Sequence, residues 1–123
     1  MIKELNKQYK GFTYGVLENT WLSCERGYGN GYIAIPKYHK GYKSFADIGL
    51  YSEIEVHGGI TYAVPEDNVN IIGFDTAHHG DNSENCDLEY CINECKSVIN
   101  QIDKLRLYKW FAIPMVLLRR LRV

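Results

Sequence analysis

Apolar and polar residues alternate along four short segments in the first 77 residues, as they do in strands with one buried face. These segments are FTYGVLE (12–18), GYIAIPK (31–37), IEVHGGITYAV (54–64) and NIIGFD (70–75). Turn-forming residues separate them at GYGNG (27–31), Gly41 and PEDN (65–68). Tyr and Thr alternating with aliphatic residues suit half-buried strands. We therefore predict a small antiparallel β-core within residues 1–80.

The pattern changes after HHGDNSEN to a helical one. Apolar residues recur at steps of three and four, which predicts an amphipathic helix over about 84–108: Leu88, Cys91, Ile92, Cys95, Val98, Ile99, Ile102 and Leu105. Asn82 or Ser83 is the expected N-cap, and Pro114 suits the first turn of a second short helix, MVLLRRLR. We predict an α+β fold over a single domain, 1–123, with C-terminal helices in 81–123. The narrow stripe predicts a helix that crosses the sheet and also pairs with a second copy in a dimer.

Composition and charge bound the class of protein. Apolar residues make up 46% of the 123 residues and charged residues 24%, with a net charge of −1, which is typical of a globular domain without a nucleic-acid-polymer surface. Charge is divided along the chain. Residues 81–103 hold six acids against one lysine, and residues 104–123 hold six bases and no acid. This division suggests acid-to-base helix pairing or an anion-binding end.

The chain ends and the cysteines bear on location. MIKELNKQYKGF lacks the apolar core of a signal peptide. The run WFAIPMVLL (110–118) is too short to span a bilayer. The basic residues that follow it are compatible with an alternative, a helix that lies in the membrane interface. Four cysteines do not form the framework of a small secreted protein. We expect a cytoplasmic protein that does not cross a membrane.

Histidine and cysteine side chains raise the question of a metal site. His78 and His79 precede Cys86, Cys91 and Cys95, and four such ligands could hold zinc if they converged. The two later cysteines fall on the apolar stripe, however, where a free thiol behaves as a small hydrophobe. We therefore predict structural thiols, no metal and no cofactor.

A second group with chemical potential is His57 with Asp75 and His78. An aspartate that orients a histidine can serve acid–base catalysis. No nucleophile stands in a recognisable setting, because there is no G-x-S-x-G elbow and Cys24 has no base near it in sequence. These residues could equally contact a ligand or form hydrogen bonds within turns.

The glycine-rich GYGNGY (27–32) could cradle a phosphate on backbone amides, or it could be a hairpin turn. Trp21, Arg26 and Tyr28 surround it, and an aromatic ring beside a guanidinium can stack a base and bind a phosphate. Trp21 could instead pack on the core. Arg106 and Lys109 end the long helix, where cations interact favourably with the helix dipole whether or not a ligand is present.

Three segments in order, GYIAIP, EVHGGITY and IIGFDTAHHGD, are followed by the cysteine-containing LEYCINECKSVINQ. This arrangement resembles a family of small bacterial and phage proteins, the phage Thoeris anti-defence proteins of type one. The resemblance covers roughly residues 20–105, and VHGG and GFDTAH are its specific parts.

The resemblance implies a protein that sequesters a signal. The family binds glycocyclic ADP-ribose, a cyclic ADP-ribose isomer made by bacterial TIR-domain enzymes, without cleaving it, so that the defence effector stays off. Some members are described as hexamers, which corresponds to a trimer of dimers, and bind cyclic oligonucleotides at separate sites. The implied fold is a β-core with C-terminal helices that pair in a dimer.

Candidate ligand contacts follow from the chemistry of such a nucleotide. Trp21 would stack adenine, with Tyr28 as a further ligand contact beside it. The pyrophosphate would meet Arg26, Arg106 and Lys109, and the riboses would meet Asn82, Asp75 and His78, with His57 beside them. No catalytic residue is predicted. Two alternatives stay open: a nucleotide or phosphoester hydrolase that uses His57, Asp75 and His78, and a structural module whose apolar tail binds a partner protein.

Overall fold

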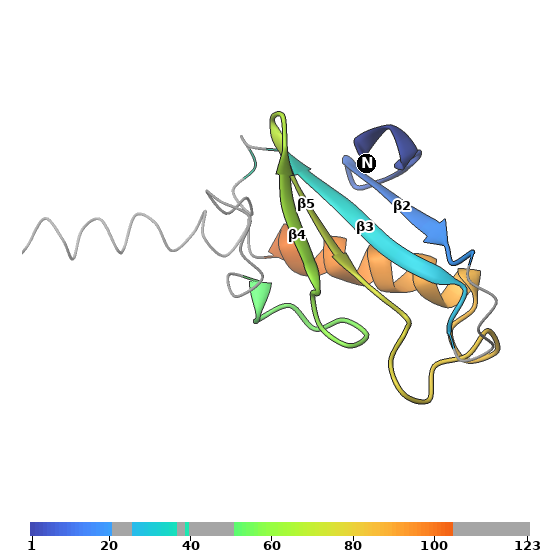
Figure 1. The fold of residues 1–123 in the computed structure, drawn as a ribbon. Coiled ribbons are helices and arrows are strands. Elements are labelled where there is room, and N and C mark those ends of the chain that lie inside the picture. The colour runs from blue at the N-terminus through green and yellow to red at the C-terminus, as the bar shows by residue number, and fades with distance from the viewer. Residues whose placement is uncertain (21–25, 37–38, 40–50, 105–123) are drawn as a thin grey trace, which may run out of the picture.

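The computed structural model describes residues 1–20, 26–36, 39 and 51–104. In these residues a five-stranded antiparallel sheet lies against one long helix, residues 88–104, which confirms the predicted α+β class (Figure 1). The residues of the predicted second helix lie outside the described residues, as do Trp21, Cys24, Gly41, Arg106 and Lys109. The dimer stays a prediction.

The spatial order of the strands is β1-β2-β3-β5-β4, so that β3 and β5 lie inside the sheet and β4 is an edge. A short 3₁₀ helix, η1 (Ile2–Glu4), precedes them. The strands are β1 (Lys7–Tyr9), β2 (Phe12–Glu18), β3 (Gly29–Pro36), β4 (Tyr62–Glu66) and β5 (Val69–Phe74).

Three of the four predicted strands are confirmed. β2 has the predicted bounds, and β3 and β5 differ from the predictions by at most two residues. β1 was missed because a three-residue strand of mostly polar residues gives little periodic signal. The turn between β1 and β2 consists of Lys10 and Gly11, which both adopt positive φ, at 49° and 81°. Positive φ at both positions is typical of a tight two-residue hairpin.

The prediction of one strand over 54–64 was wrong. Gly58 and Gly59 have φ of 70° and 79°, and the amide of Gly59 donates to the carbonyl of Val56 at 2.8 Å. This backbone makes a turn and cannot continue an extended strand. The strand starts only at Tyr62 and runs through Pro65, which an edge strand tolerates although proline has no amide hydrogen.

The helix starts later than predicted, at residue 88. Asp87 is the N-cap, because its Oδ1 accepts a hydrogen bond from the amide of Tyr90 at 2.8 Å. Asn82 caps a separate turn, in which its Oδ1 accepts from the amides of Glu84 and Asn85. The predicted cap residue was thus assigned to the wrong element.

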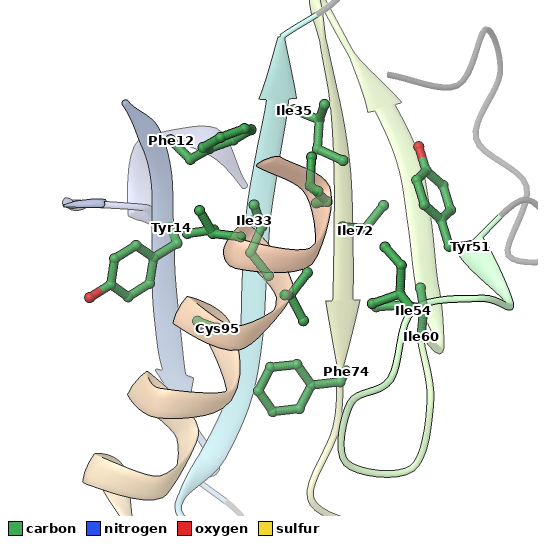
Figure 2. Packing of buried hydrophobic residues seen from close by; sticks show 13 residues of the cluster. Phe12, Tyr14, Ile33, Ile35, Tyr51, Ile54, Ile60, Ile72, Phe74 and Cys95 are labelled. Carbon is green, nitrogen blue, oxygen red and sulfur yellow. The ribbon is translucent and has the colours of Figure 1, made fainter. Parts of the chain in front are cut away.

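The core lies between the helix and one face of the sheet (Figure 2). Aromatic and branched residues of β2, β3 and β5 meet the helix there: Phe12, Tyr14, Ile33, Ile35, Ile72 and Phe74 from the sheet, and Cys95, Val98, Ile99 and Ile102 from the helix. The segment 51–60 closes one side with Tyr51, Ile54 and Ile60. Cys91 and Cys95 are fully buried, as predicted for structural thiols, whereas Leu88 of the predicted stripe is exposed.

The N-terminal residues link β2 to β4. Leu5 is buried close to Gly15 of β2. The amide of Ile2 donates to Glu66 of β4 at 3.2 Å, and the N-terminal ammonium lies 3.4 Å from the same carboxylate. This short arm therefore ties together strands that lie apart in the sheet.

Burial of the helix thiols predicts a loss of stability in alkaline solution. Burial raises the pKa of Cys91 to about 11 and that of Cys95 to about 12. An unfolded thiol loses its proton near pH 8.5. Above that pH the folded state holds more protons than the unfolded state, so stability falls, by at most about 1.4 kcal/mol per pH unit for each thiol. Urea unfolding at pH 8 and pH 10 measures this. Cys95→Ala, which lacks one of the thiols, should lose less between the two, and equal losses would refute the assignment.

Within the described part of the chain, no helix combines the length and apolar character needed to cross a bilayer.

Candidate functional site

The two histidine-containing segments, 56–59 and 74–81, come together beside the start of the helix. Side chains from both segments and from the helix region form a group that we name the polar cluster: His57, Asp75, His78, Asp81, Cys86 and Tyr90. The pairs that join the segments are His57 with Asp81 and Gly58 with His78. The parts of the sequence that carry the family resemblance thus form one local structure.

Both ring nitrogens and the backbone amide of His57 have partners within the protein. Its Nε2 lies 2.9 and 3.0 Å from the two carboxylate oxygens of Asp81, and its Nδ1 lies 2.8 Å from the Tyr90 hydroxyl. Its backbone amide donates to Glu94 at 2.9 Å. With both ring nitrogens engaged, the His57 ring is oriented by contacts of the loop before β4 with the helix and with the segment that precedes it.

Asp81 is the buried charge of the cluster. It is 7% exposed and accepts a hydrogen bond from the amide of His78 at 2.9 Å. Burial raises the pKa of its carboxyl, but the His57 ring and the His78 amide lower it by more, so the pKa of Asp81 lies below its usual value. Asp81 is therefore ionised at neutral pH and stabilises the turn 78–81.

Cys86 approaches the same side of the His57 ring, with its Sγ 3.9 Å from Nε2. A catalytic cysteine uses a histidine whose other nitrogen binds an orienting carboxylate. Here the Asp81 carboxylate meets the same nitrogen as the thiol. Burial, and then the charge of Asp81, raise the pKa of Cys86, so the thiol is not activated as a nucleophile.

Asp75 and His78 are the more accessible members of the cluster, with side chains 30% and 40% exposed. The Asp75 carboxylate accepts hydrogen bonds from the Thr61 hydroxyl at 2.9 Å and from the Ala77 amide at 3.1 Å, so it caps a turn. His78 Nε2 lies 3.3 Å from Asp75 Oδ1 without the geometry of a hydrogen bond. Nε2 of His78 therefore has no hydrogen-bond partner, and this atom is buried although the side chain as a whole is partly exposed.

The segment 26–28 runs beside the polar cluster. The amide of Gly27 donates to the Thr76 carbonyl at 2.7 Å, and the amide of Tyr28 donates to the Cys86 carbonyl at 2.7 Å. Arg26 is exposed and Tyr28 is half-buried. The backbone of both predicted ligand-contact residues is thus near the histidine segments.

The glycines of GYGNGY do not form a phosphate cradle. Gly29 and Gly31 belong to β3 and pair with β2, and neither they nor Gly27 have positive φ. A backbone nest needs a residue in the left-handed region. The alternative prediction, that GYGNGY is a hairpin turn, was also inexact, because β3 already starts at Gly29 within this segment.

Of the nine predicted ligand contacts, six are in the described residues and lie in this region: Arg26, Tyr28, His57, Asp75, His78 and Asn82. The side chains of Asn82 and Asp75 accept hydrogen bonds from backbone amides in their own local turns. The sequence reasoning missed Asp81 and Tyr90, and it considered Cys86 only as one of several candidate zinc ligands. The signal for Asp81 was present, since it ends the HHGD motif, and Tyr90 stands one helical turn before Glu94, which also contacts His57.

Comparisons of the chain with protein-family models, with curated proteins and with solved structures find no match.

Proposed function

We propose that this protein binds a small cyclic nucleotide, glycocyclic ADP-ribose or a close isomer, and sequesters it without cleaving it, so that Thoeris anti-phage defence stays off. One observation carries the proposal. The segments behind the family resemblance, VHGG and GFDTAHHGD, form a single polar cluster with half-buried Asp75 and His78 as its more accessible members.

The chemistry of the cluster favours binding over hydrolysis. His57, the residue best placed to act as a general base, has protein partners on both ring nitrogens. A base must reach the proton that it abstracts. Hydrolysis by His57, Asp75 and His78 is the alternative function, and it would require His57 to leave Asp81 or Tyr90.

Recognition of the nucleotide would use the accessible groups. Ribose hydroxyls suit the Asp75 carboxylate and the His78 ring, and a phosphate suits the exposed guanidinium of Arg26. A nucleotide of this size has about 35 heavy atoms, and about 0.3 kcal/mol per atom would reach nanomolar affinity. Sequestration at that strength needs no catalytic group.

Two adjacent histidines provide the test. His78 belongs to the cluster, whereas His79 is exposed and outside it. Titration calorimetry with glycocyclic ADP-ribose should give submicromolar affinity for the wild-type chain. His78→Ala should weaken binding roughly ten-fold, as expected for loss of a hydrogen bond worth about 1.4 kcal/mol, and His79→Ala should leave the affinity unchanged.

Circular dichroism melts of both variants serve as the folding control. Absence of binding by the wild-type chain would refute the proposed function. Equal affinities of the two variants would remove His78 from the site.

A further inference from the structure

We propose that His57, Asp81 and Cys86 form a three-ligand site for a zinc ion. The His57 Nε2, an Asp81 carboxylate oxygen and the Cys86 Sγ all lie within 4.8 Å of one another. Asp81 and Cys86 are buried, and the His57 side chain is 19% exposed. The three residues come from the loop before β4 and from the segment that leads into the helix, so the fold brings them together.

The separations between the donor atoms are close to those around zinc. With Zn–N and Zn–O bonds of about 2.0 Å and a Zn–S bond of about 2.3 Å, tetrahedral angles separate N from O by about 3.3 Å and N from S by about 3.6 Å. The corresponding distances from His57 Nε2 are 3.0 Å to Asp81 Oδ1 and 3.9 Å to Cys86 Sγ. Shifts of a few tenths of an ångström would therefore complete the site.

The direction from which the groups approach His57 distinguishes a metal site from a catalytic triad. The carboxylate and the thiol both face Nε2, and the Tyr90 hydroxyl holds Nδ1. In a triad the nucleophile and the orienting carboxylate meet opposite nitrogens. Three donor atoms that converge on one point are what a cation requires.

The nitrogen, oxygen and sulfur donor atoms indicate which metal ion the site would prefer. Imidazole and thiolate favour zinc over magnesium or calcium, which prefer oxygen ligands. A thiolate, a carboxylate and a neutral imidazole carry two negative charges together, which match one divalent ion. The sequence placed zinc, as an alternative, on His78, His79, Cys86, Cys91 and Cys95. Of these five residues, only Cys86 belongs to the site that we propose. Cys91 and Cys95 are fully buried in the core.

Outer contacts would orient the ligands as they do in known zinc sites. Tyr90 holds Nδ1 of His57 at 2.8 Å, and its hydroxyl lies 3.4 Å from Glu94. The amide of His78 holds the Asp81 carboxylate at 2.9 Å. Such contacts leave Nε2 and the second carboxylate oxygen directed at the proposed ion.

The experiment uses the untagged full-length chain, incubated with zinc chloride and then dialysed against metal-free buffer. Atomic emission should find about one zinc ion per chain, as for a single site with three protein ligands and an open fourth position. Cobalt titration of the same chain should produce tetrahedral d–d bands and a thiolate-to-cobalt charge-transfer band, which identifies sulfur as a ligand even without a variant.

Two buried thiols supply a matched pair. Cys86→Ala should abolish the charge-transfer band and weaken zinc binding roughly ten-fold or more, and Cys91→Ala should retain both. A wild-type chain that holds no zinc after dialysis, or a cobalt complex without a thiolate band, would overturn the proposal. So would a Cys86→Ala variant that binds zinc as tightly as the wild-type chain. None of these results depends on nucleotide binding.

Discussion

Replacing Gly31 with alanine should destabilise the fold by about 3 kcal/mol, because the position has no space for a side chain. Gly31 lies in β3 opposite Val16 of β2 and Phe74 of β5. A Cβ there would meet the Phe74 ring and would lie 2.6 Å from the Cys95 sulfur. The glycine therefore sets how closely the helix approaches the sheet.

Gly15 is the matched control, since it lies on the neighbouring strand and also faces a covered surface. Its Cβ would lie 3.1 Å from both Cα and Cδ2 of Leu5 and 3.3 Å from the Glu4 carbonyl oxygen, so the N-terminal arm would need to shift by only a few tenths of an ångström. We expect Gly15→Ala to lose about 1 kcal/mol. Urea unfolding of both variants gives the comparison, and an equal loss in the two would show that helix and sheet are not packed as described.

The second large effect is expected at Gly58. Both Gly58 and Gly59 have positive φ, so alanine at either position should lose about 1–2 kcal/mol through backbone strain. A Cβ on Gly58 would also lie 2.6 Å from Cδ2 of His78, whereas one on Gly59 would meet open space. Gly58→Ala should therefore lose about 1–3 kcal/mol more than Gly59→Ala.

This difference isolates the contact between the two histidine segments from the strain that both variants share. Urea unfolding measures the stabilities, and the His78 ring resonances in an NMR spectrum report whether that side chain moves. If Gly59→Ala were as damaging as Gly58→Ala, the packing of Gly58 on His78 would be wrong.

The sheet and helix could be predicted because burial imposes a period on their residues. The burial of FTYGVLE alternates over its first three residues, and β2 has the predicted bounds. The segment 54–64 alternates too, yet paired glycines in the left-handed region turn the chain before Tyr62. Periodicity reports burial and does not report backbone conformation, which explains this error.

The site was predictable only in part. His57 and His78 stood out because each lies beside a glycine turn, and the structure brings them within 5.7 Å between ring centroids. Asp81, Cys86 and Tyr90 join them through the packing of the helix on the loop before β4. No spacing in the sequence reports such a contact, because it depends on the crossing of elements far apart in the chain.

The fate of bound nucleotide tests most directly whether the polar cluster holds a signal without altering it. The purified chain is incubated with glycocyclic ADP-ribose, separated from free ligand and heat-denatured, and the released nucleotide is identified by mass spectrometry. We predict that the released nucleotide has the mass and retention time of the starting compound. Recovery of a cleaved product, or of no nucleotide with the protein, would contradict this prediction.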